Sequence, residues 1–143
     1  MVLSDGAARP DLLRWLVKPL VWLACLAPAV LLGLRLAGVA GPSLGPNPVE
    51  AILDVLGKSA LNLLLATLAV TPLRLATGWS ALVRLRRLLG LWAFAYALAH
   101  ASFYAAVDQG LDWALLAEDV VRRPFITAGM AALLLLVPLA ATS

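Results

Sequence analysis

The residue best able to do chemistry is His100, the only histidine in the chain. It lies in a stretch from Leu88 to Val107 that carries no formal charge. An imidazole in hydrocarbon leaves polar nitrogens short of partners, so an ionisable residue inside a membrane segment is a functional-site hypothesis by default. Three roles compete: a structural hydrogen-bonding residue, a proton relay, and an axial ligand to heme iron. A proton relay usually comes with further intramembrane acids or histidines, and this sequence offers none.

Mostly small residues share the helical face of His100. Their spacing alternates between three and four, which places them on one stripe: Gly90, Ala93, Ala97, His100, Tyr104 and Val107. Such a stripe leaves room for a flat, bulky group or for a closely packed neighbouring helix. At 1.5 Å per residue, His100 lies about 10 Å from the Val107 end, in the outer half of the membrane.

A six-coordinate heme needs a second ligand, for which Met130 is the candidate within the chain. It lies about six residues into the last apolar segment, at a depth close to that of His100. Methionine in an apolar helix is more often core filler. A second histidine from beyond Ser143 or from another chain is therefore favoured.

The composition excludes an ordinary soluble domain. Hydrophobic residues make up 63% of the chain and charged residues 13%, and the mean hydropathy is +0.95. The net charge of +3 does not indicate nucleic-acid binding, because the basic residues lie between apolar runs rather than on one folded face. Cys25 is the only cysteine, so no intrachain disulfide can form.

Four segments are long and apolar enough to cross a hydrocarbon core about 30 Å thick as helices. The sequence predicts an all-α integral membrane protein, a four-helix transmembrane bundle. A cytoplasmic amino-terminal segment is expected at 1–17 and a transmembrane domain at 18–143, with helices at 18–40, 48–73, 88–107 and 125–141; this domain is the heme-binding one if His100 is a heme ligand. Asn47 is expected to cap the second helix, with Pro48 at its first position and Glu50 reaching back to the cap.

The positions of the basic residues predict the orientation of the bundle. One side carries Arg9, Arg14, Lys18, Arg74, Arg84, Arg86 and Arg87. The other carries Arg35, Lys58, Arg122 and Arg123, the last two near Asp108, Asp112, Glu118 and Asp119. The amino terminus is therefore predicted to be cytoplasmic and the acidic loop to lie outside.

Four segments together resemble a known family. They are Asn47-Pro48-Val49-Glu50, TLAVTPLRLATGW from Thr67, RRLLGLWAFAYALAH from Arg86, and RRPFITAGM from Arg122. The chain resembles the heme-binding membrane subunit of the periplasmic methionine-sulfoxide reductase system, the MsrQ or YedZ family, of the ferric-reductase-like transmembrane class. Family members continue through about two more helices, giving about six, so the resemblance implies a chain incomplete at its carboxyl end.

The resemblance implies an electron-transfer subunit of the bacterial inner membrane rather than a catalytic subunit. Such subunits carry heme b and are described as binding FMN. They draw electrons from the quinone pool or a flavin donor and pass them to a periplasmic, molybdopterin-containing catalytic subunit that repairs oxidised methionines. His100 matches the third-helix histidine of the family, which implies heme ligation at this residue.

Two further features have competing interpretations. Arg122 and Arg123 lie at the outer mouth of the fourth helix, where they are candidates for clamping heme propionates or for simple interfacial anchoring. The acidic third loop is either a docking surface for a partner or a solvated loop. The rival to the whole hypothesis is a cofactor-free membrane scaffold or transporter subunit, which predicts a colourless protein.

Overall fold

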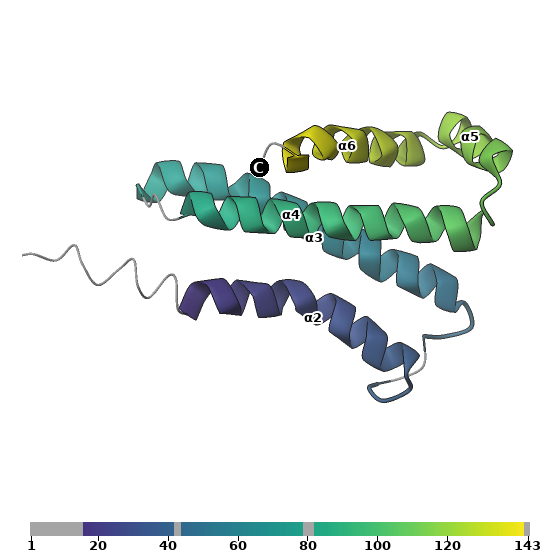
Figure 1. The fold of residues 1–143 in the computed structure, drawn as a ribbon, viewed down its shortest axis with the longest axis horizontal. Helices are drawn as coiled ribbons and strands as arrows, with labels where there is room; N and C mark the ends of the chain where they lie inside the picture. The colour runs from purple at the N-terminus through teal and green to yellow at the C-terminus, as the bar shows by residue number, and fades with distance from the viewer. Residues whose placement is uncertain (1–15, 42–43, 79–81, 142–143) are drawn as a thin grey trace, which may run out of the picture.

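The computed structural model describes residues 16–41, 44–78 and 82–141. Every regular element in these ranges is helical (Figure 1). In chain order they are α2 (Lys18–Leu36), α3 (Pro48–Thr77), α4 (Leu82–Phe103), the π-helix η2 (Tyr104–Asp108), α5 (Trp113–Arg122) and α6 (Pro124–Ala141).

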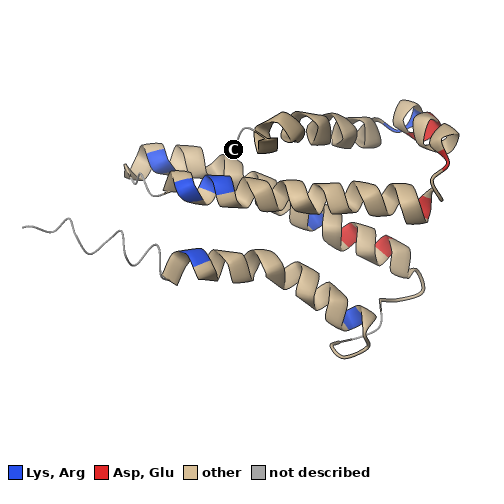
Figure 2. Ribbon diagram, viewed as in Figure 1, with Lys and Arg blue, Asp and Glu red and all other residues tan. Residues whose placement is uncertain are grey.

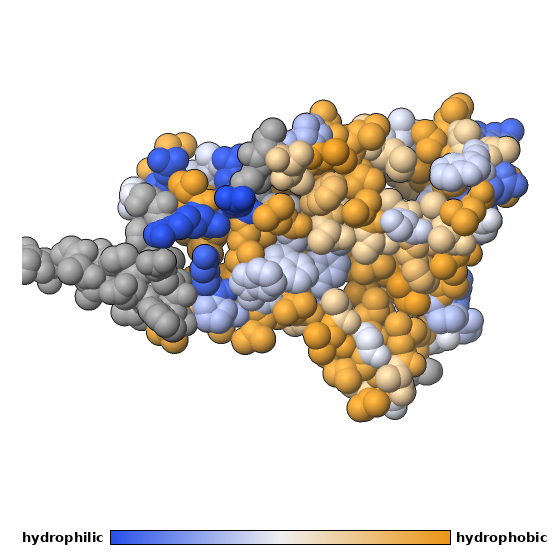
Figure 3. All heavy atoms as spheres, viewed as in Figure 1, coloured by the Kyte–Doolittle hydropathy of each residue, from blue (hydrophilic) through white to orange (hydrophobic). Residues whose placement is uncertain are grey.

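Within the described residues, four helical spans are long and apolar enough to cross a membrane. They are Lys18–Leu36, Pro48–Thr77, Leu82–Asp108 and Pro124–Ala141. Successive spans run in alternate directions (Figure 1), and apolar side chains cover most of the visible face (Figure 3). A helix satisfies its own backbone hydrogen bonds, which hydrocarbon cannot do for it. The predicted all-α, four-helix membrane architecture is confirmed.

The helix bounds differ from those expected at several ends. α2 stops at Leu36 rather than at residue 40, because Gly38 adopts a left-handed conformation with φ +70° just past the helix end. α4 begins at Leu82 rather than at residue 88, and so includes the basic residues that precede the apolar run. Arginine is a good helix former, so a charged first turn continues the helix beyond the hydrocarbon. The short helix α5 was not predicted.

The start of α3 follows its capping residues. Asn47 is the N-cap, and its Oδ1 accepts a hydrogen bond from the Glu50 backbone N–H at 3.4 Å, with Pro48 in the first position. Glu50 does reach back, but its carboxylate accepts from the Asn47 side-chain amide at 3.2 Å. Gly78 ends the helix in a left-handed conformation, with its N–H donating to the Arg74 carbonyl at 2.8 Å. The capping prediction is confirmed in substance, with a side-chain amide as the partner of Glu50.

α3 and α4 form the most extensive helix pair, and α6 packs on α4 and α5. Small residues bring the pair together: Ala93 is buried, and a Cβ on Gly90 would lie 3.6 Å from the Thr67 methyl. α2 joins the bundle through aromatic rings. Trp22 meets Trp92 edge-on, with ring centroids 5.3 Å apart.

Charge separates along the bundle (Figure 2). Lys and Arg without acids lie at the end where α2 and α4 begin, whereas the acids of the described chain lie toward the opposite end. Arg9 and Arg14 of the orientation argument lie outside the described residues.

Candidate functional site

His100 lies near the C-terminal end of α4 and faces α3. Its Nδ1 is 2.9 Å from the backbone carbonyl oxygen of Leu53. A carbonyl can only accept, so Nδ1 carries the proton and donates it to Leu53. In a neutral imidazole, Nε2 is then the unprotonated nitrogen with a free lone pair.

Gly57 of α3 makes this contact sterically feasible. A Cβ at position 57 would lie 3.1 Å from His100 Cε1 and 3.2 Å from Nδ1, closer than ordinary van der Waals contact. Any side chain there would press on the imidazole. Gly57 was not predicted from the sequence as part of the site, although an isolated glycine inside an apolar helical pattern often has a packing or functional reason.

The stripe of small residues on α4 is closely packed near Gly90 and only half-buried at His100. At Gly90 the stripe is filled by α3, through the Thr67 side chain, and Ala93 is buried. Of the two alternatives drawn from the sequence, the closely packed helix applies to this part of the stripe. His100 itself is only half-buried. A flat ligand could therefore reach the imidazole, but not the stripe at Gly90, which α3 occupies.

Tyr96, one turn before His100 on α4, forms hydrogen bonds with α2 instead of α3. Its hydroxyl donates to the Cys25 carbonyl at 2.7 Å and accepts from the Ala29 backbone N–H at 3.2 Å. Both groups flank Pro28, which lacks a backbone N–H and so removes one hydrogen bond from α2. α2 bends near its middle (Figure 1), and the tyrosine supplies polar partners beside the proline.

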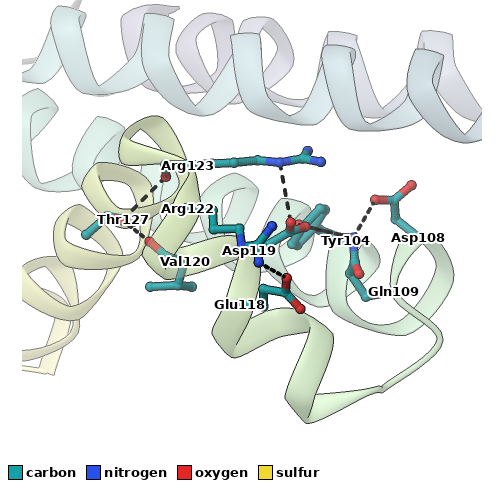
Figure 4. A network of polar contacts seen from close by, with 9 residues as sticks. All are labelled: Tyr104, Asp108, Gln109, Glu118, Asp119, Val120, Arg122, Arg123 and Thr127. Carbon is teal, nitrogen blue, oxygen red and sulfur yellow. Dashed lines mark hydrogen bonds and ion pairs between the residues drawn. The ribbon is translucent and has the colours of Figure 1, made fainter.

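A second polar cluster lies one turn beyond His100 (Figure 4). Tyr104 donates its hydroxyl proton to Asp119 at 2.6 Å, and the Gln109 amide donates to both groups at 3.2 and 3.1 Å. Arg123 Nε lies 3.3 Å from the other Asp119 oxygen. The cluster ties α5 to η2, which continues α4. The sequence analysis did not pair these residues.

The two arginines predicted as propionate contacts pair with acids one turn earlier. Arg122 lies 2.9 Å from Glu118, and Arg123 lies 3.3 Å from Asp119. Both guanidinium groups remain largely exposed just before the start of α6. Their present partners are carboxylates, the same chemistry that a propionate would offer.

The hydrogen bond from His100 to a backbone carbonyl is a feature expected of an axial heme ligand. A ligating histidine commonly donates its second ring N–H to a backbone carbonyl, which fixes the tautomer and orients the ring. The Leu53 contact has this arrangement. Met130, the second ligand candidate, lies on α6 with 41% of its surface exposed.

These features define a class: a multi-pass helical membrane protein with one intramembrane histidine whose ring is held by a neighbouring helix. Comparison with known families agrees. Residues 56–143 match the family described as ferric reductase like transmembrane component. The chain belongs to this family.

Individual relatives are more specific. The chain is 50% identical over 123 residues to the protein-methionine-sulfoxide reductase heme-binding subunit MsrQ of Rhodospirillum rubrum, an alignment covering 86% of this chain and 58% of the relative. It is 47% identical over 136 residues to the MsrQ protein of Caulobacter vibrioides, covering 94% and 63%. The chain thus spans about three fifths of the length of these relatives. No solved structure gives a significant match. The family resemblance predicted from the motifs is confirmed.

Proposed function

We propose that this chain is a heme b membrane subunit that delivers electrons to a periplasmic, molybdopterin-containing methionine-sulfoxide reductase. One observation carries the proposal: His100 donates from Nδ1 to the Leu53 carbonyl, which leaves Nε2 available as a ligand. The names of the relatives, which describe heme-binding subunits of a methionine-sulfoxide reductase, support it. The chain would act as the electron-transfer subunit rather than the catalytic one.

Each residue near His100 has a defined task in this proposal. Leu53 holds the ring and sets its tautomer, and Gly57 leaves space for the ring against α3. Bound heme would supply a one-electron carrier whose potential depends on ligand identity and burial. Arg122 and Arg123 would exchange part of their pairing with Glu118 and Asp119 for the heme propionates.

The proposed orientation places the amino terminus in the cytoplasm of a bacterial inner membrane. The basic end of the bundle, without acids, supports this direction (Figure 2). His100 would then lie in the outer half of the membrane, which shortens the distance to a periplasmic partner. Electrons would come from the quinone pool or a flavin donor. FMN binding remains a prediction from the family resemblance.

Docking of the partner on the acidic loop has less support than electron transfer itself. Asp112 caps α5 by accepting from the Ala114 and Leu115 N–H groups, and Asp108 accepts from Gln109. With Glu118 and Asp119 paired to arginines, these acids already have partners within the fold. Electron transfer to the partner that does not respond to salt would argue against docking through them.

The test is a dithionite-reduced minus oxidised absorption spectrum of the protein purified from heme-supplied cells. The expected result is a b-type spectrum that His100→Ala abolishes or shifts. Unchanged bands in His100→Ala would overturn the ligand assignment. A protein without bands would favour the alternative, a cofactor-free scaffold or transporter subunit.

A further inference from the structure

The short helix α5 (Trp113–Arg122) has a flank that faces the rest of the protein. Leu116, Asp119 and Val120 are the half-buried residues of this helix. The Asp119 side chain is only 17% exposed and accepts a hydrogen bond from the Tyr104 hydroxyl, so this flank is fixed against η2 (Figure 4). The orientation of α5 about its own axis is therefore set.

Two other flanks of α5 are uncovered and differ in chemistry. Trp113 is 75% exposed and Val121 is 84% exposed, with exposed Ala117 between them. Their spacing of four places them on one line of the helix. Glu118 and Arg122 form an exposed ion pair on the adjoining flank. Ala114 and Leu115 are also exposed and lie close to that pair, so the polar flank carries two apolar residues.

The connections on both sides keep α5 at the boundary of the membrane. It joins a span ending at Asp108 to a span beginning at Pro124. On one side only residues 109–112 intervene, and on the other only Arg123, whose extended backbone before proline separates the two helices. Four residues reach at most about 14 Å even when fully extended. At ten residues α5 is itself about 15 Å long, too short to cross the hydrocarbon.

We propose that α5 lies in the membrane interface, with Trp113, Ala117 and Val121 inserted in lipid and with Glu118 and Arg122 facing water. A strongly amphipathic helix with a tryptophan on its apolar side is suited to the boundary between head groups and acyl chains. The occupant of the apolar flank is lipid, because short connections join α5 directly to two membrane spans. The proposal is independent of heme binding and of which side of the membrane α5 occupies.

The experiment places a spin label at Val121→Cys or Glu118→Cys in a Cys25→Ala background, with the protein in lipid nanodiscs. Cys25 is buried, so its removal deletes only an inaccessible thiol. Collisions with oxygen, which partitions into lipid, are compared with collisions with a water-soluble nickel chelate. The oxygen-to-nickel ratio should be several-fold higher at position 121 than at 118. Equal ratios, or free access of the nickel chelate to 121, would overturn the proposal and leave that flank for a protein partner.

A measurement without cysteine substitution gives a second test. Fluorescence quenching by lipids brominated near the top of the acyl chain is compared between the unmodified protein and Trp113→Phe. Loss of a strongly quenched component in the variant is expected. Identical quenching in both proteins would place Trp113 outside the lipid and overturn the proposal. Circular dichroism of each variant checks that the helices are retained.

Discussion

α4 carries two polar rings one turn apart, and they face different neighbours. Tyr96 contacts the backbone of α2 beside Pro28, and His100 contacts the backbone of α3 beside Gly57. Tyr96 is 4% exposed, and its hydroxyl both donates and accepts. His100 is half-buried and donates from one nitrogen.

This difference in hydrogen bonding suits Tyr96 to a structural role and His100 to ligand binding. Tyr96 uses its hydroxyl in both roles, so it fixes the bent helix α2 against the bundle. His100 uses one nitrogen to set its position and tautomer, and the other keeps its lone pair. Tyr96 and His100 are one turn apart and both bind backbone groups of a neighbouring helix, but their expected roles differ. Substitutions at each residue can test this distinction.

The largest expected effect is at the imidazole itself. His100→Ala removes the proposed axial ligand and should abolish or shift the heme bands. Tyr96→Phe on the same helix should leave those bands in place, because its hydroxyl contacts only α2. Equal loss of heme in both variants would indicate damage to the fold rather than loss of a ligand.

Gly57→Ala should have the next largest effect. The new methyl group would lie 3.1 Å from His100 Cε1 and would push the ring from its Leu53 contact. Loss of such an orienting contact typically lowers metal-site affinity about 10- to 100-fold. Heme titration of the purified protein measures the change.

Two other helical glycines provide controls for Gly57→Ala. A Cβ on Gly129 would meet nothing within 4 Å, and one on Gly90 would make an ordinary 3.6 Å contact with Thr67. Gly129→Ala should leave heme affinity unchanged, and Gly90→Ala should change it little. A loss of affinity in Gly129→Ala equal to that in Gly57→Ala would contradict the contact-based explanation.

Tyr96→Phe should lower the free energy of unfolding and leave heme binding unchanged. It leaves the Cys25 carbonyl and the Ala29 N–H without the tyrosine hydroxyl. Hydrogen bonds between helices in membranes contribute about 0.6 kcal/mol on average and up to about 1.7 kcal/mol. A loss near 1 kcal/mol is therefore expected in reversible unfolding in mixed detergent micelles. Unchanged stability would mean that water or the helix itself replaces the hydroxyl.

The smallest effect is expected where α5 meets η2. Asp119→Asn keeps the side-chain shape but removes the charge that accepts from Tyr104 and pairs with Arg123. A partly exposed pair of this kind contributes up to about 1 kcal/mol. Amide exchange in α5 should quicken, whereas Glu118→Gln, which alters a more exposed pair, should change it less. Similar exchange in both variants would argue that Asp119 does not hold α5.

Much of the local structure could be predicted from residue chemistry. The start of α3 was predictable from Asn47, Pro48 and Glu50, because a helix cap depends only on residues within four positions of each other. The end of α2 and the existence of α5 were harder to predict. The first depends on a glycine conformation at Gly38, and α5 is too short to give a long periodic signal.

The sequence alone determined that this chain forms membrane-spanning helices with one histidine inside them. Long apolar stretches have no other way to satisfy their backbone in lipid. Only the tertiary structure decided that His100 meets Leu53, 47 residues earlier, and that Gly57 makes room for the ring. Helical periodicity says which residues share a face, but the partner of that face depends on how closely two helices can approach.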